Sequence, residues 1–178
     1  VDDTAGVVRQ WAADRAFDPV IDVLSHSVNR GPGAAFATAF ESLTGRLDAG
    51  DWVLTMEGDN TSRLELVRQM MTRAQEGFDV VLASPYLYGG GIANTSPYRT
   101  FLSFVANVFV KEAIGLQGIV TMSSIFRLHS GDVILRLQAR FGNRIVERTG
   151  FECMVEMLLK LSSMRASISE VAMVLDTS

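Results

Sequence analysis

The chain has 178 residues, of which 16 are Lys or Arg and 20 are Asp or Glu, giving a formal net charge of −4. This length fits one α/β domain, and 48% hydrophobic residues against 20% charged residues exclude a disordered chain. The acidic balance argues against a general nucleic-acid binder, and a single cysteine, Cys153, excludes both a disulfide framework and a four-cysteine zinc site.

Strand-like and helix-like periodicities alternate along the chain. Apolar runs predict strands at residues 20–25, 51–56, 78–84, 124–128 and 168–175. Amphipathic patterns predict helices at residues 34–47, 64–75, 97–114, 132–140 and 151–162, and residues 6–16 are a further candidate helix. This alternation predicts an α/β fold whose mainly parallel sheet is flanked by helices on both faces. Ligands bind beyond the carboxyl ends of such strands, so candidate site residues are expected there.

The most apolar segment, residues 101–116, is interrupted by Ser103, Asn107, Lys111 and Glu112. It lacks the run of about 18 apolar residues that a membrane-spanning helix needs. Two interpretations remain open for it, a buried helix and an interfacial helix that lies close to a lipid.

The first candidate site residues, Asp2 and Asp3, follow Val1 directly. A carboxylate at the end of a strand can accept hydrogen bonds from a nucleobase or a ribose. The alternative is that these residues cap the candidate helix at residues 6–16.

The second candidate is Asn29-Arg30-Gly31-Pro32-Gly33, which opens a predicted helix. Glycines let a backbone approach a ligand, and the N–H groups at a helix start favour phosphate. The segment is not a dinucleotide-binding fingerprint, because Phe36 takes the position of the third glycine, and it is not a P-loop. An ordinary turn is the alternative.

The third candidate is the pair Glu57 and Asp59, which follows the predicted strand at residues 51–56. Two carboxylates at the mouth of a buried strand suit a hard divalent cation, Mg²⁺ or Mn²⁺, that leaves coordination positions for diphosphate oxygens. A solvated acidic turn is the alternative.

Three further groups of residues have weaker signals. The glycines at residues 89–91 predict either a mobile loop that closes over a ligand or a surface connection. Glu152, Glu156 and Lys160 have helical spacing and predict a salt-bridged face, although Glu152 could instead point into a site. No suitable ligand spacing surrounds the two histidines, and no nucleophile-elbow pattern surrounds the serines at 123, 124 and 130. These patterns argue against a zinc site and against a serine hydrolase.

The order of these motifs resembles that of the GT-A glycosyltransferases of family 2, and most closely their polyprenyl-phosphate (dolichol-phosphate) mannosyltransferase-like branch. The resemblance extends over residues 1–175. It is carried by Val1-Asp2-Asp3, by the segments 29–35, 56–60, 77–84 and 123–127, and by Gly150-Phe151-Glu152 through Glu170-Val171.

The resemblance implies a single GT-A catalytic domain over residues 1–178 that lacks the family's first strand and its C-terminal segment. It implies an inverting enzyme that moves a sugar, with mannose favoured, from a nucleotide diphosphate sugar to a polyprenyl phosphate. It further implies a divalent metal cofactor, Mg²⁺ or Mn²⁺. The expected location is the cytoplasm at the inner face of the membrane, with peripheral membrane contact and a possible homo-oligomer. No nucleic-acid partner is expected.

The same resemblance assigns roles to individual residues. Glu57 and Asp59 occupy the family's Asp-x-Asp position for metal and diphosphate, although Glu57 stands where the first Asp is usual. Asp59 and Arg127 are the expected catalytic residues, and Arg127 is expected to clamp a phosphate. The residues expected to bind the nucleotide-sugar donor are Asp2, Asp3, Asn29, Gly31, Gly33 and Glu57.

Two other functions stay open. The chain could be a family 2 enzyme that acts on a glycan hydroxyl, which would require a general base, with Asp79 and Glu152 as candidates. A phosphate acceptor needs little help from a base, because it is largely a dianion at neutral pH. The chain could also be a non-catalytic domain that binds nucleotide sugars.

Overall fold

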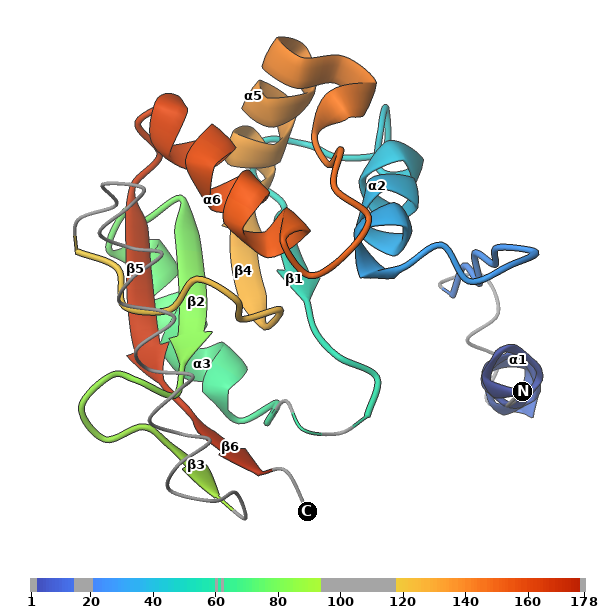
Figure 1. Ribbon diagram of the computed structural model, residues 1–178, viewed down its shortest axis with the longest axis horizontal. Helices are drawn as coiled ribbons and strands as arrows, with labels where there is room; N and C mark the ends of the chain where they lie inside the picture. Colours follow the sequence, from blue (N-terminus) through green and yellow to red (C-terminus); the bar gives the residue numbers. More distant parts are fainter. Residues whose placement is uncertain (1–2, 15–20, 60, 62, 94–117, 177–178) are drawn as a thin grey trace.

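The computed structural model describes residues 3–14, 21–59, 61, 63–93 and 118–176 (Figure 1). The helices are α1 (Thr4–Asp14), α2 (Pro32–Ser42), α3 (Leu66–Gln75), α5 (Gly131–Phe141), the short 3-10 helix η2 (Gly142–Arg144) and α6 (Cys153–Ser163). The strands are β1 (Trp52–Thr55), β2 (Val80–Ser84), β3 (Gly91–Ala93), β4 (Arg127–Ser130), β5 (Ile168–Ala172) and β6 (Val174–Asp176). No helix in these ranges is long and apolar enough to cross a membrane.

The main sheet has the strand order β1-β4-β2-β5. Strand β4 is antiparallel to both of its neighbours, whereas β2 and β5 are parallel. Strands β1, β2 and β5 therefore run in one direction and β4 runs against them. The predicted α/β class is confirmed, and the reversed β4 makes the sheet mixed. Strands β3 and β6 form a separate parallel pair.

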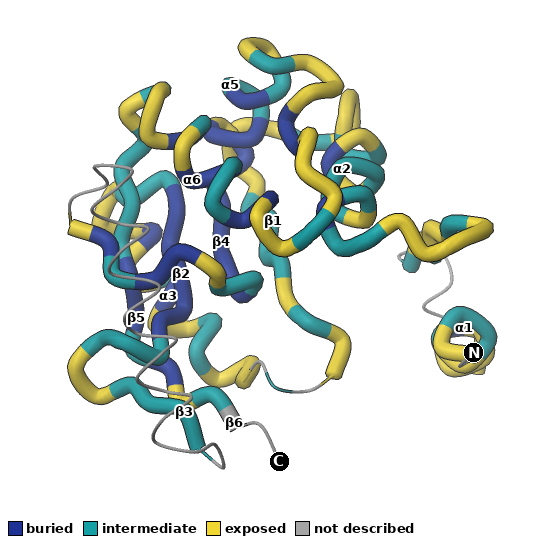
Figure 2. The backbone as a smooth tube through the Cα atoms, in the orientation of Figure 1, coloured by how far each residue is buried: buried dark blue, intermediate teal, exposed yellow. Residues whose placement is uncertain are grey.

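Helices cover both faces of the main sheet (Figure 1). Alternate residues of β2 divide between two hydrophobic clusters, since Val80 and Leu82 pack into one and Val81 and Ala83 into the other. The first cluster lies against α2, α5 and α6, and the second lies against α3. Figure 2 shows the buried residues gathered along β2, β4 and the inner sides of these helices.

Helix α5 shows how local sequence fixes an element beside the sheet. Ser130 caps it, because the Ser130 hydroxyl accepts a hydrogen bond of 3.1 Å from the Val133 backbone N–H. Val133, Ile134 and Leu137 are buried at helical spacing, so one face of α5 joins the core.

Some predicted elements differ from the observed ones. Residues 21–26 form no strand, because no described strand pairs with them and Leu24 is exposed. The strand expected at 124–128 begins at Arg127, and the one expected at 168–175 divides into β5 and β6. The helix predicted at residues 97–114 lies outside the described residues.

The glycine-rich segment lies close to neighbouring backbone. Gly91 begins β3 and its N–H donates to the Met173 carbonyl at 3.0 Å. A Cβ on Gly90 would lie 2.7 Å from the Ser84 carbonyl oxygen. Such close approach explains a glycine here without a ligand.

Candidate functional site

A pocket of about 710 Å³ opens between α2 and β1. Helix α2 contributes Phe36 and Phe40, and Leu43 follows directly after the helix. Strand β1 and the residues that follow it contribute positions 53–57. The Arg46 guanidinium and the Asp22 carboxylate also line it and form an exposed ion pair of 2.7 Å. A mainly apolar pocket with a few polar groups is typical of small-molecule sites.

The wall on α2 is aromatic because two phenylalanines are one helical turn apart. The Phe36 and Phe40 rings are stacked with centroids 6.3 Å apart. Phe40 is buried in the core, while Phe36 is only half-buried. Phe36 therefore presents an aromatic surface to the pocket on which a planar group could stack.

Glu57 and Asp59 lie where the sequence places them, just after the carboxyl end of β1. Glu57 is half-buried and lines the pocket, and Asp59 is exposed. The Asp59 Oδ1 atom accepts hydrogen bonds from the Thr61 hydroxyl at 2.6 Å and the Thr61 backbone N–H at 3.0 Å. These hydrogen bonds hold the pKa of Asp59 below its usual value, so this carboxylate stays ionised at neutral pH.

Metal binding by this carboxylate pair stays a prediction, and a cation held there would need further ligands from its substrate or from water. The described residues contain no group of three or more His, Cys, Asp or Glu side chains suited to hold a metal alone. Mg²⁺ is commonly bound by one or two carboxylates together with water and substrate phosphates. Glu57 and Asp59 supply two hard oxygen donors, and Asp59 is open to solvent.

The glycines before α2 make close contacts with a distant part of the chain. The Gly33 N–H donates to the Thr149 carbonyl at 2.8 Å, and a Cβ on Gly33 would lie 1.8 Å from the Arg148 carbonyl oxygen. Gly31 has φ +84°, and a Cβ there would lie 2.4 Å from the Thr149 carbonyl oxygen. The Asn29 side chain accepts from the Gly31 N–H at 2.9 Å.

These contacts give Asn29, Gly31 and Gly33 a role in packing α2. The Gly33 N–H at the helix start is already used by a protein carbonyl. Packing of α2 accounts for these contacts without a ligand, and donor binding by these three residues stays a prediction.

Asp3 lies at the start of α1, which Figure 1 shows to one side of the main body. The Asp3 carboxylate accepts a hydrogen bond of 3.2 Å from the Gly6 N–H, which is the capping alternative. Asp3 is not among the residues that line the pocket. Asp2 lies outside the described residues, and nucleotide binding by either aspartate stays a prediction.

Arg127 does not fit the phosphate clamp expected from the resemblance. The side chain is only 1% exposed, and its guanidinium donates to three carbonyls: Ser124 at 2.6 Å, Met122 at 3.0 Å and Met154 at 3.1 Å. Burial lowers the pKa of Arg127 to about 10, and the group remains protonated at neutral pH. Arg127 therefore links residues 122–124 to helix α6 inside the protein.

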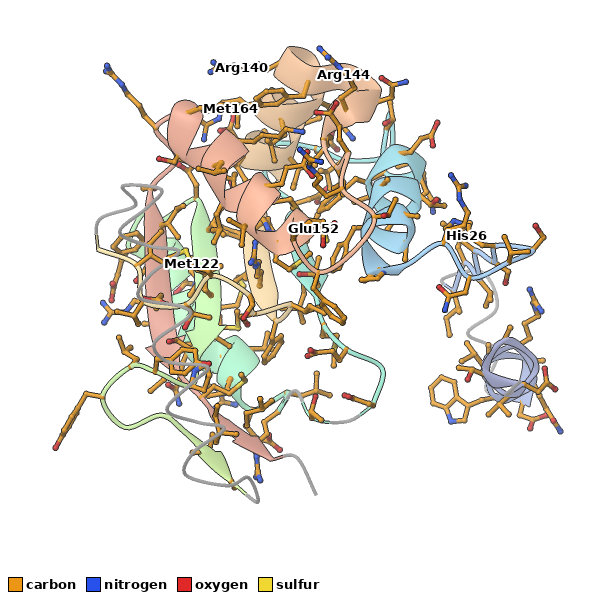
Figure 3. All side chains as sticks on the ribbon, viewed as in Figure 1. His26, Met122, Arg140, Arg144, Glu152 and Met164 are labelled. Carbon is orange, nitrogen blue, oxygen red and sulfur yellow. The ribbon has the colours of Figure 1, made fainter. Side chains whose placement is uncertain are left out.

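The two candidate general bases lie in different surroundings. Asp79 precedes β2, at the edge opposite the carboxyl ends, and accepts from the Ser167 N–H at 2.8 Å while pairing with Arg136 at 3.0 Å. Asp79 therefore lies at the opposite edge of the sheet from the pocket and is not placed to act as a base there. Figure 3 places Glu152 at the start of α6, where its carboxylate accepts from the Gly150 N–H at 3.2 Å.

Of the salt-bridged face predicted for Glu152, Glu156 and Lys160, the structure contains the ion pair between Glu156 and Lys160. Lys160 Nζ lies 2.6 Å from Glu156 and 3.0 Å from Glu147. Burial acts to raise the pKa of Glu156, but hydrogen bonds from Lys160 and from the backbone N–H groups of Arg148 and Glu147 outweigh it, and the pKa is lowered. This cluster is a structural network that stabilises the turn before α6.

Sequence reasoning missed most of the pocket wall. The helical spacing of Phe36 and Phe40 predicts a helix. It does not show whether their side of the helix packs on the sheet or lines a pocket beside the sheet. Ile125, which also lines the pocket, is brought there by residues before β4 that were expected to be strand. The part of the site that the sequence does predict is the pair Glu57 and Asp59, because both follow an apolar strand directly.

Most of the chain matches the model of a known protein family. The family model "Glycosyl transferase family 2" matches residues 1–132, a shorter span than the resemblance stated from the motifs. The match includes α2, β1 and the Glu57–Asp59 segment. No curated protein matches the chain. Because most of the chain fits this model, the chain belongs to glycosyl transferase family 2 and is a glycosyltransferase with the GT-A fold.

Proposed function

We propose that residues 1–178 act as one catalytic domain that transfers a sugar, with mannose favoured, from a nucleotide diphosphate sugar to a polyprenyl phosphate. The observation that carries this proposal is the position of Glu57. Glu57 lines a mainly apolar pocket with an aromatic wall, and Asp59 follows two residues later. The closer specificity, for mannose and for a lipid phosphate, rests on the motif resemblance.

The pocket supports a division of the donor into two parts. The base is planar and partly apolar, which suits the half-buried face of Phe36. The diphosphate is anionic and belongs beside Glu57 and Asp59, which would hold Mg²⁺ or Mn²⁺ there. When bound, the cation supplies positive charge that stabilises the departing nucleoside diphosphate.

The proposed reaction exchanges one bond for another at the anomeric carbon. An oxygen of the acceptor phosphate forms a bond to this carbon as the bond to the nucleoside diphosphate breaks, which inverts the configuration. A phosphate dianion has no proton to lose, so no general base takes part. The location of Asp79 at the opposite edge supports this choice, because it removes one of the two candidate bases for a hydroxyl acceptor.

Peripheral membrane contact at the cytoplasmic face is part of the proposal, because a polyprenyl phosphate resides in a membrane. The apolar segment at residues 98–116 is the proposed contact, and it lies outside the described residues. Flotation with liposomes tests it. Binding should fall when charged residues replace apolar ones in this segment, and binding that survives these changes contradicts the assignment.

The first experiment measures donor binding. GDP-mannose, UDP-glucose and UDP-GlcNAc are titrated into the purified protein by calorimetry, each with and without Mn²⁺. Metal-dependent binding of GDP-mannose is expected. Binding of a uridine donor alone would contradict the preference for mannose, and the absence of binding by any donor would contradict the donor site.

The second experiment measures transfer. Asp59→Asn should lower transfer to a short polyprenyl phosphate about 100-fold at saturating Mg²⁺, because it removes a charged oxygen ligand. The matched control is Glu65→Gln, which neutralises an exposed carboxylate nearby in sequence and should leave the rate unchanged. Unchanged transfer by Asp59→Asn contradicts the mechanism. Transfer only to a sugar hydroxyl, or binding without any transfer, favours one of the two alternative functions.

A further inference from the structure

Residues 119–126 cross the carboxyl ends of the main sheet, and we name them the edge loop. In Figure 1 this gold segment runs from the β5 side to the start of β4. Ile119, Thr121, Met122 and Phe126 are buried, although the loop has no regular secondary structure. Figure 3 labels Met122 near its middle.

Two strands hold the end of the edge loop that is close to the pocket. The Thr55 hydroxyl of β1 donates to the Ile125 carbonyl at 2.7 Å. Arg127 of β4 donates to the carbonyls of Ser124 and Met122. This end therefore joins the strand that leads to Glu57, and Ile125 itself lines the pocket.

The other two strands hold the far end. The Ser84 hydroxyl of β2 is hydrogen-bonded to the Thr121 hydroxyl. The Glu170 carboxylate of β5 accepts from the Val120 N–H at 2.8 Å and from the Thr121 N–H at 2.9 Å, one with each oxygen. Glu170 is only 8% exposed, so both bonds are made by a charged group in a largely dry environment, where such bonds are strong.

Each strand of the sheet therefore supplies one side chain to the same loop. The order of the contacts along the loop, from Ile125 back to Val120, follows the strand order β1-β4-β2-β5. The loop is therefore held along its length by side chains of the sheet. Ser123 is exposed on it and Ser124 is half-buried.

We infer that Glu170 is a positioning residue for the acceptor, acting through the edge loop. This inference rests on the proposed function. In the proposed function the donor occupies the pocket at the β1 end of the edge, so the exposed Ser123 of the loop lies on the side from which an acceptor would reach the sugar. Glu170 touches neither substrate in this arrangement. Its carboxylate sets where the loop, and with it Ser123, stands relative to the sugar.

The test compares Glu170→Gln with the wild-type protein. Glutamine keeps the shape, but it offers one acceptor oxygen and turns an NH₂ group toward a backbone N–H. The amides of Val120 and Thr121 should exchange hydrogen about tenfold faster. The KM for a short polyprenyl phosphate should rise about tenfold, while the dissociation constant of the donor stays within about twofold.

Two further variants separate positioning from general damage. Glu76→Gln changes an exposed carboxylate that lines the same small surface pocket as Glu170 and should change none of these quantities. Thr121→Val removes the hydrogen bond to Ser84. It should raise the acceptor KM, as Glu170→Gln does, but by a smaller factor. It provides a second measurement if Glu170→Gln folds poorly.

The outcomes distinguish this inference from the proposed function. Wild-type transfer is measured first, and its absence contradicts the proposed function. If the wild-type protein transfers but Glu170→Gln leaves amide exchange and the acceptor KM unchanged, the role of Glu170 is wrong. An equal loss of donor and acceptor binding also overturns it, because that result indicates general destabilisation.

Discussion

Strands β1 and β2 have similarly apolar sequences but different surroundings. All five residues of β2 are buried, whereas all four of β1 are half-buried. Strand β2 lies between β4 and β5, while β1 pairs with β4 and borders the pocket on its other side. The comparison shows that β2 lies wholly in the core, whereas β1 also lines the pocket that we propose for the donor. Substitutions in the two parts should therefore affect different measurements.

The largest loss of stability is expected from Arg127→Ala. It leaves three carbonyls of the buried part without their donor, which should cost about 4 kcal/mol in the free energy of unfolding. Urea denaturation measures this loss. Arg73→Ala removes an exposed ion pair with Glu76 and should cost less than about 0.5 kcal/mol. A similar, small loss for both variants would contradict the fastening role of Arg127.

A direct test of the strand comparison uses one residue from each strand. Leu82→Ala in β2 should cost about 3 kcal/mol, because it opens a cavity in the core. Val53→Ala in β1 should cost about 1 kcal/mol, because this side chain is already half-exposed. The two variants should have the reverse order in donor affinity, which calorimetry measures. Equal stability losses would remove the distinction between the strands.

The contact that anchors α2 can be tested with Gly33→Ala. The added Cβ would overlap the Arg148 carbonyl oxygen, so a loss of about 2 kcal/mol is expected. Gly50→Ala is the control, since no atom lies within 4 Å of a Cβ there. Thermal unfolding measures both. A neutral Gly33→Ala would show that residues 148–149 can move away from α2 at little cost.

The smallest effect concerns acid pH and His129, which is fully buried on β4 with its ring edge-on to Phe40. Burial, together with the Arg127 charge, lowers the pKa of His129 to about 3. Below the ordinary pKa of about 6.5 the unfolded chain therefore binds a proton that the folded chain does not bind. Stability is retained above this pH and falls by about 1.4 kcal/mol at pH 5.5.

His129→Leu should remove this part of the pH dependence, as urea denaturation at pH 7.5 and pH 5.5 would show. His26→Gln is the control, because His26 is only half-buried and is hydrogen-bonded to Thr38. An unchanged slope in His129→Leu would mean that another group causes the loss at acid pH.

Much of the fold was predictable because its signals are local. Strands β1 and β2 and helices α3, α5 and α6 lie within the predicted segments or a few residues from them. Their apolar periodicity depends only on neighbours along the chain. The strand expected at 20–25 failed for a nonlocal reason, because a strand needs a partner and none is described beside residues 21–26.

The candidate site also has one part that the sequence predicts and one part that it does not. The position of Glu57 and Asp59 follows from the end of a strand and was predictable. The burial of Arg127 was not, since the carbonyls that surround it come from the edge loop and from α6. An arginine that binds backbone carbonyls has no sequence signature to distinguish it from one that binds phosphate.

The contact of Gly33 with Thr149 affects the order in which parts of the protein can fold during synthesis. Helix α2 forms from residues synthesised early, yet the carbonyls that hold it in place come from residues 148 and 149. Glu170, which holds the edge loop, is made later still. Contacts between residues so distant in sequence form slowly, because a long loop must close first. A nascent chain that ends at residue 132 would contain the whole family match. It would lack both the contact that holds α2 and the contact that holds the edge loop.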